Sequence, residues 1–320
     1  MPHIRAHRHR TTVKTKTDMS TTTVLLSIPP RLQWKHGNGF CGEVSIQSIA
    51  LKYGAWISQG LIRKINKGEY LLQPVSSGDR RNPLQTLTQL HLTYDEWNWK
   101  DSPQPQFRQF CQWMKRSILQ GHPVVFGIFL PDDDCDDYDH IVPAVGIKYE
   151  NEDEHDPDHD KLIYYDLYEL QQIEKGLNEK EFAATRASIA DKEDADDGCL
   201  PLNVDYGIAI TGIIDKDGVT LPVHLSVSAC DEPVPYFFLE PREMNGTVTV
   251  SGLSVGNFYA LLRYSSYKHV PTGGDADAFL QSSYDEIHVF MAMESNYVYD
   301  DPKTIPSHGS VYYRCVIIPE

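Results

Sequence analysis

Residues 37–43 read Gly37-Asn38-Gly39-Phe40-Cys41-Gly42-Glu43, and they lead directly into an apolar run with helical spacing. Glycine accepts positive φ angles freely, so this stretch predicts a flexible turn. The apolar run consists of Val44, Ile46, Ile49, Ala50 and Tyr53. Its spacing predicts a buried helix that begins near Cys41 and stops at Gly54.

Two apolar segments further along the chain each carry a polar residue at one end. Asp139-His140-Ile141-Val142-Pro143-Ala144-Val145-Gly146 places a histidine at the start of a predicted strand. Leu162-Ile163-Tyr164-Tyr165-Asp166 predicts a following strand that ends in a carboxylate. Antiparallel pairing of the two strands would bring His140 and Asp166 together.

Cys41, His140 and Asp166 therefore form a candidate cysteine-nucleophile site. Amide N–H groups at a helix start favour a thiolate, which predicts a lowered pKa for Cys41. The thiolate needs an imidazole within hydrogen-bond reach, and the imidazole needs an orienting group. Each residue also has a plain structural explanation: a small buried thiol, a loop histidine and a strand-end cap. The sequence alone leaves these structural roles open.

The order of the motifs resembles the papain-like cysteine peptidase superfamily, and it is nearest to the bacteriocin-leader-processing (double-glycine) type. The resemblance covers roughly residues 30–170. It implies an α+β fold in which the helix of Cys41 packs on an antiparallel sheet that carries His140 and Asp166. It also implies a thiol-dependent hydrolase or acyl-transfer enzyme that acts on a peptide or amide bond, without a cofactor or a metal.

The oxyanion donor is the point where the chain departs from that family. The family places a glutamine six residues before the cysteine, and Lys35 occupies that position here. Gln33 fits if the intervening loop is longer, and Asn38 also offers an amide donor. Loss of one such donor costs about 10²–10³ in rate. The alternative is a papain-like binding module with a weak or inactive site.

Other segments predict the layout around this site. A second helix is expected over Ile57, Leu61, Ile62 and Ile65, and a third over Phe107–Ile118, closed by Gly121.

Acidic runs at 132–139 and 150–160 predict loops near the cleft and favour a basic peptide or protein substrate. His155 and His159 have the i, i+4 spacing of zinc ligands, but Pro157 between them argues against a helix.

From about residue 200 the pattern changes to short strands, typical of an all-β module. Tyr206–Ile214 and Val219–Val227 flank Asp215-Lys216-Asp217-Gly218, which predicts a hairpin. The segment Leu253–Tyr259 resembles a turn of fibronectin type III-like β-sandwiches, and this implies that Tyr259 anchors the turn. In such a module the β-sandwich would contribute to specificity by docking the substrate.

We therefore predict three parts: a basic, disordered tail at 1–22, a papain-like domain at 23–200 and a β-sandwich at 201–320. The tail also has the basic, Thr-rich composition of a transit peptide, but it lacks apolar residues at helical spacing.

The composition of the chain argues against several other functions and indicates a compartment. The formal net charge is −16, although residues 1–17 carry five basic residues and no acid. Such an acidic body predicts no binding to nucleic acid. No run of 18 apolar residues exists, so no membrane span is expected. The six cysteines form no C-x-x-C pair, which predicts reduced thiols in a cytoplasmic or other intracellular soluble compartment.

Overall fold

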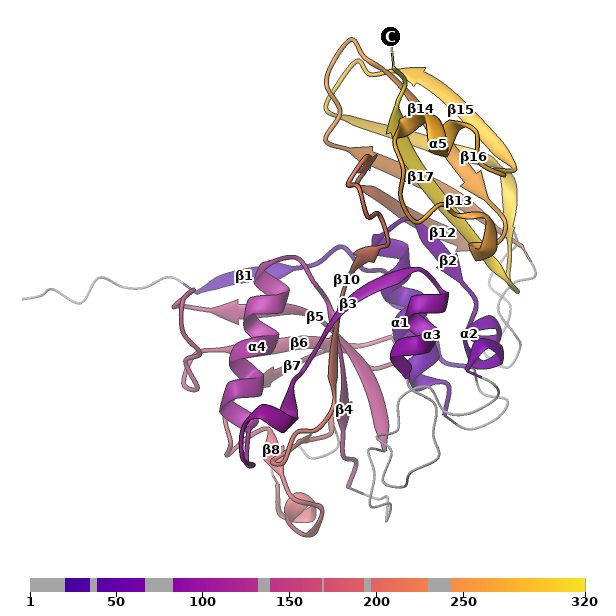
Figure 1. Cartoon of the computed structure of the whole chain (residues 1–320). Coiled ribbons are helices and arrows are strands. Elements are labelled where there is room, and N and C mark those ends of the chain that lie inside the picture. The colour runs from indigo at the N-terminus through magenta and orange to yellow at the C-terminus, as the bar shows by residue number, and fades with distance from the viewer. Residues whose placement is uncertain are drawn as a thin grey trace, which may run out of the picture.

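The protein is described by a computed structural model that covers residues 21–34, 39–66, 83–131, 139–168, 170–192, 197–229 and 243–319. It is a mixed α and β structure, in which one large sheet with its helices lies below two smaller sheets (Figure 1). The predicted α+β class is confirmed at this level. The predicted tail at 1–22 lies almost wholly outside the described residues.

The large sheet has seven strands. Six follow the order β3-β10-β4-β5-β6-β7, and β1 pairs with the second half of β5. Their bounds are β1 (Thr22–Leu25), β3 (Leu92–Glu96), β4 (Val124–Ile128), β5 (His140–Tyr149), β6 (Lys161–Tyr165), β7 (Gln172–Gly176) and β10 (Gly207–Ile213). All of these pairings are antiparallel. The predicted strands beginning at His140 and ending near Asp166 are therefore neighbours, as expected.

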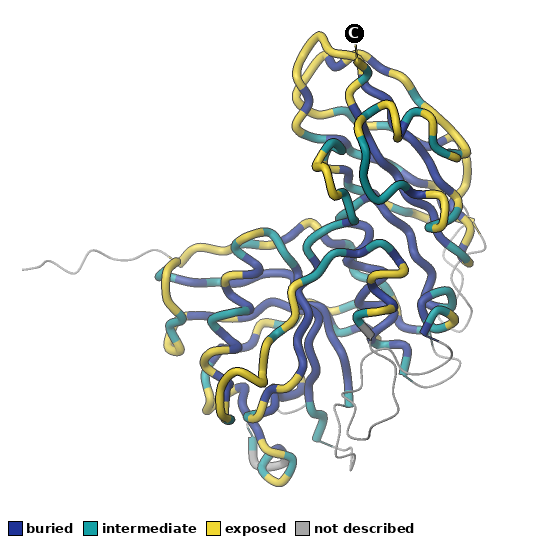
Figure 2. The backbone as a smooth tube through the Cα atoms, in the orientation of Figure 1, coloured by how far each residue is buried: buried dark blue, intermediate teal, exposed yellow. Residues whose placement is uncertain are grey.

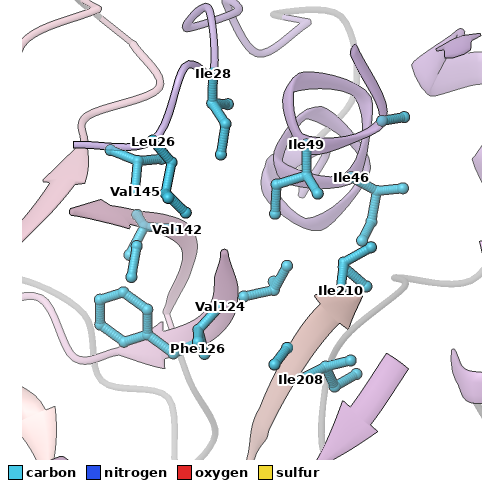
Figure 3. Packing of buried hydrophobic residues seen from close by; sticks show 14 of the residues in the cluster. Leu26, Ile28, Ile46, Ile49, Val124, Phe126, Val142, Val145, Ile208 and Ile210 are labelled. Carbon is cyan, nitrogen blue, oxygen red and sulfur yellow. The ribbon is translucent and has the colours of Figure 1, made fainter. Parts of the chain in front are cut away.

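Helix α1 (Cys41–Lys52) is buried along almost its whole length, from Gly42 to Leu51. Ile46 points toward Ile210 (Figure 3), and both Ile46 and Ile49 belong to the main apolar core. Leu51, two residues after Ile49, belongs to a second core formed with the C-terminal strands. The helix ends where Gly54 takes a φ of +74°, as the sequence predicted.

A second helix packs on strands β4 and β5 of the large sheet. Helix α4 (Phe107–Leu119) buries an apolar face formed by Phe107, Phe110, Cys111, Met114 and Ile118, which is the predicted set. Gly121, with a φ of +84°, follows its end. The other helical and minor strand segments are α2 (Gln59–Ile65), α3 (Pro83–Gln89), η1 (Trp99–Asp101), η2 (Arg186–Asp191), β8 (Ala183–Ala184) and β9 (Leu200–Pro201).

The C-terminal region forms two further sheets. One contains β11 (Thr220–Leu221), β17 (Ser310–Ile317), β14 (Phe258–Tyr264) and β15 (Glu286–Met291), and the other contains β12 (Val223–Ala229), β13 (Glu243–Ser251) and β16 (Asn296–Pro306). Helix α5 (Ala276–Leu280) and the turn η4 (Tyr267–His269) lie between strands β14 and β15 in sequence. Apolar residues of both sheets form the second core, and Figure 2 shows these strands buried beneath exposed edges.

Three expectations require correction. Ile57 lies in strand β2 (Ala55–Ile57), which pairs with β17, so it is not part of the second helix. Strand β10 belongs to the large sheet, whereas β11 and β12 belong to the C-terminal sheets, so the predicted hairpin around Asp215–Gly218 is wrong. Because β10 lies after residue 200 and β2 before it, the sheets do not divide at the predicted boundary.

Candidate active site

Cys41 is the first residue of α1, and Arg63 of α2 fixes the chain on either side of it. Arg63 Nε donates to Glu43 Oε1 at 2.5 Å, and its Nη2 donates to the carbonyl oxygen of Gly39. The guanidinium carbon lies 4.0 Å from the ring centroid of Phe40. One side chain therefore holds the turn before Cys41 and the helix after it. No local pattern in the sequence indicates this role of Arg63.

His140 is the first residue of β5 and is buried, with 5% of its surface exposed. The preceding residue, Asp139, accepts hydrogen bonds from Leu130 N at 2.6 Å and from Arg186 Nη2 at 2.7 Å. The Arg186 guanidinium also lies over the ring of Phe129. This partly buried ion pair fixes the start of the strand, and so it fixes the position of His140.

The structure brings Cys41 against the strand of His140. The hydroxyl oxygen of Ser45 lies 2.8 Å from the carbonyl oxygen of Cys41 and 3.4 Å from that of Ile141, and so links α1 to β5. The backbone N–H of Ile141 faces the Cys41 thiol and acts to lower its pKa. Within the described ranges, His140 Nε2 is buried without a hydrogen-bond partner, so it makes no hydrogen bond to the thiol in this arrangement.

Asp166 follows the end of β6, the strand next to β5. Its Oδ1 accepts a hydrogen bond from the backbone N–H of Tyr168 at 3.0 Å, which forms a tight turn. Its charge acts on His140 and raises the imidazole pKa, but burial of the ring has the larger, opposite effect. Asp166 is therefore in electrostatic contact with His140.

Tyr168 covers the imidazole and was not singled out by the sequence. Its ring stacks on that of His140, with 5.2 Å between centroids and 13° between planes. Burial raises the pKa of the Tyr168 phenol, and the nearby Cys41 thiol raises it further. Its position two residues after Asp166, opposite His140 on the extended register of β5 and β6, is the signal that would have identified it.

Gln33 reaches the same place from the segment before α1. Its backbone N–H donates to the carbonyl oxygen of Leu167 at 2.9 Å, and its side-chain amide acts on the Tyr168 phenol and lowers the phenol pKa. Gln59 holds the neighbouring residues: Nε2 donates to Leu32 O at 2.9 Å, and Oε1 accepts from Trp34 N at 3.1 Å. Gln33 is therefore held on both sides.

The second oxyanion candidate, Asn38, and Lys35 lie outside the described residues. Of the two candidate oxyanion donors, Gln33 and Asn38, it is Gln33 that lies beside Tyr168 and, through Tyr168, beside Cys41.

The expected activation of Cys41 by the helix start is wrong for this arrangement. Burial raises the pKa of the thiol to about 11, with a smaller increase from Glu43, and the N–H groups of Ile141 and Gly42 only partly oppose this. Burial also lowers the pKa of His140 to about 4. Both groups are therefore neutral at neutral pH, because each charged form would be poorly solvated.

The acidic loops do not both surround this site. Residues 132–138 lie outside the described residues, and Asp139 is paired with Arg186. The 150–160 loop follows Tyr149, at the far end of a ten-residue strand from His140. Ten strand residues extend for about 30 Å, so the prediction that this loop lies near the cleft is wrong.

His155 and His159 do not form a shared metal site in the structure. The segment between them is a turn, and their Nδ1 atoms lie 3.0 Å from Asp160 and 2.9 Å from Asp156, respectively. Within the part of the chain that the structure describes, no three histidine, cysteine or acidic side chains are grouped to hold a metal ion.

Tyr259 has the structural role that the sequence predicted. Its hydroxyl oxygen accepts a hydrogen bond from the backbone N–H of Ser254 at 2.9 Å, and the side chain is buried. It thus fixes the turn that precedes β14. This contact is structural and gives no information about a substrate.

The chain matches no protein-family model, no curated protein and no solved structure. Among the described helices, none has both the length and the apolar character needed to cross a bilayer.

Proposed function

We propose that the chain is a papain-like thiol hydrolase or acyl-transfer enzyme with Cys41 as nucleophile, His140 as base and Asp166 as the orienting acid. One observation carries the proposal: the buried Nε2 of His140 lacks a partner among the described residues, and the next residue, Ile141, directs its N–H toward the Cys41 thiol. A buried imidazole nitrogen without a partner is costly, and a reacting thiol would compensate it. The two C-terminal sheets would form the sandwich-like domain that contributes to specificity.

The first chemical step would begin from a neutral pair. As Cys41 Sγ forms a bond to the substrate carbonyl carbon, its proton moves to His140, and the carbonyl electrons move onto oxygen. The Gln33 amide and the Cys41 backbone N–H would hold that oxyanion. His140 would then give the proton to the leaving amine as the C–N bond breaks. Water or another nucleophile would finally cleave the thioester.

Asp166 and Tyr168 would position the imidazole. The Asp166 charge favours the imidazolium that forms during attack, as its effect on the His140 pKa indicates. The stacked Tyr168 ring limits rotation of His140 and shields its charge from bulk water. The acidic run before His140 in the sequence supports a basic peptide or protein as substrate.

A second candidate function is a papain-like binding module with an inactive site. The observation that favours it is the electrostatic state of the pair: the Cys41 pKa is raised to about 11, and the His140 pKa is lowered to about 4. Reactive cysteines commonly have lowered pKa values. Such a module would bind a peptide at the same place without cleaving it.

The experiment that separates these functions is a cleavage assay on a peptide library. New termini are identified by mass spectrometry after incubation with the wild-type chain, with Cys41→Ala and with Cys199→Ala. The enzyme hypothesis expects cleavage by the wild type and by Cys199→Ala, whose thiol is buried elsewhere, and none by Cys41→Ala. Equal cleavage by wild type and Cys41→Ala would exclude the nucleophile. Retention of library peptides without cleavage by any form would support the binding module.

A further inference from the structure

A surface pocket of about 520 Å³ lies beside helix α4 and the loop that follows β5. One wall is the exposed side of α4, which contributes Arg108 and Arg116. The other walls come from Trp97 and from the loop after β5, which contributes Glu154 and His155. None of these side chains takes part in the cysteine chemistry proposed above.

A buried charge network supports the wall of this pocket. Lys115 and Asp160 both have fully buried side chains, and Lys115 Nζ lies 2.8 Å from each carboxylate oxygen of Asp160. Asp160 Oδ2 also lies 3.0 Å from His155 Nδ1. An ionised carboxylate only accepts hydrogen bonds, so Nδ1 is the donor and carries a proton. The network therefore fixes both the position and the tautomer of the His155 ring.

The second ring nitrogen of His155, Nε2, is in an unusual environment. The His155 side chain is only 6% exposed, and within the described ranges its Nε2 is buried without a hydrogen-bond partner. Trp97 also lines this pocket, and its Nε1 is likewise buried without a hydrogen-bond partner among the described residues. Unsatisfied buried polar groups are rare and call for an explanation. Two of them on one pocket point to a ligand that supplies partners.

The chemistry of the lining selects the kind of ligand. Trp Nε1 and the guanidinium groups of Arg108 and Arg116 are donors only, whereas His155 Nε2 is an acceptor in the tautomer that the network fixes. Arg108 makes an exposed ion pair with Glu179 at 3.0 Å, which a stronger anion can replace. Two arginines on one pocket stand out in a chain with a net charge of −16. Guanidinium groups match the planar geometry of carboxylate and phosphate oxygens.

We propose that this pocket binds a small anionic ligand, a phosphate ester or a carboxylate, whose flat apolar part lies against Trp97. The oxyanion is held by Arg116 and Arg108, and His155 Nε2 accepts a hydrogen bond when one phosphate oxygen of the ligand is protonated. Glu154 is the one carboxylate that borders the described pocket, and it lies on the exposed rim. It disfavours ligands with several negative charges and so favours a monoanion or dianion of small size.

Calorimetric titration of the full chain tests this proposal with three probes of the same shape: phenyl phosphate, benzoate and neutral benzamide. The expected result is binding of phenyl phosphate or benzoate with a Kd of about 1 mM or tighter, and at least about tenfold weaker binding of benzamide. Tighter binding of phenyl phosphate assigns a phosphate ester, and tighter binding of benzoate assigns a carboxylate.

Variants of the full chain locate the binding. Arg116→Gln and His155→Asn are each expected to weaken binding of the anion about tenfold or more. Lys303→Gln, which removes an exposed charge from β16, is the matched control and is expected to leave binding unchanged. Thermal melts check that each variant is folded, and Arg108→Gln replaces any variant that is not. Equal binding of benzamide, no binding of either anion, or full affinity in folded Arg116→Gln would overturn the proposal.

Discussion

Two histidines at opposite ends of β5 show how differently one fold can treat the same side chain. His140 begins the strand, lies against the helix of Cys41, and has burial as the main influence on its pKa. His155 follows the strand in a loop and is bonded to Asp160, which Lys115 in turn neutralises. Both leave a buried Nε2 without a partner among the described residues. A thiol lies near the first, and cationic side chains lie near the second.

In this fold, the chemistry of a histidine depends more on the groups next to its ring than on how the ring itself is oriented. The carboxylate beside His155, that of Asp160, is better oriented than the one beside His140. However, no thiol or hydroxyl nucleophile borders the described part of the His155 pocket. His140 has a thiol close by, and the charge of Asp166 acts on its ring. We therefore propose covalent chemistry at the first end of β5 and reversible anion binding at the second.

The largest effect is expected at the His155 end, from Lys115→Met. The substitution keeps most of the apolar stem of the side chain but leaves Asp160 buried without its cation. Breaking one partner of a buried ion pair costs about 3–5 kcal/mol. Lys148→Met is the control, because Lys148 lies on β5 in a partly exposed pair with Glu174, and its loss should cost about 0–1 kcal/mol. Denaturant unfolding of both variants provides the measurement, and equal losses would contradict the network.

The next largest effect is expected at the His140 end, from Gln33→Ala. Removal of an oxyanion donor should lower kcat by about 10²–10³, while the fold and the binding of phenyl phosphate at the other pocket stay unchanged. Gln59→Leu should lower kcat in the same direction, because it releases the backbone on both sides of Gln33. An unchanged kcat in Gln33→Ala would move the oxyanion role to Asn38.

A smaller effect is expected in the pH dependence of stability. The His140 pKa falls from 6.5 to about 4 on folding, so between these values the unfolded chain binds more protons. The stabilising contribution of His140 is therefore present above pH 6.5 and is lost as the pH falls toward 4. The free energy of unfolding of the wild type, relative to His140→Gln, should decrease by roughly 2–3 kcal/mol over that range. A constant difference between the two would show that His140 is not buried as described.

Local patterns predicted much of the framework of the site. The apolar spacing after Cys41, the strand after His140 and the strand before Asp166 are all properties of short segments, and each forms where it was expected. Antiparallel pairing of β5 and β6 then follows from their closeness in the chain. The periodic signal was strong in these segments because each is buried on the sheet.

The features that the sequence did not predict depend on long-range contacts. Strand β2 pairs with β17, and β10 inserts between β3 and β4, and neither pairing leaves a local pattern. The stacking of Tyr168 on His140 depends on the register of two strands. The raised pKa of Cys41 depends on burial by several segments, which outweighs the local effect of the helix start.

The most direct test of the account is whether Cys41 accepts an acyl group in a step that needs His140. The chain is mixed with p-nitrophenyl acetate at neutral pH, quenched at short times and digested, and the acetylated residue is located by mass spectrometry. We predict acetyl transfer to Cys41 in the wild type, and at least about 100-fold slower transfer in His140→Gln. Acetylation of Cys41 at the same rate in both forms, or acetylation spread over lysines and the other cysteines, would contradict the assignment of Cys41 and His140 as nucleophile and base.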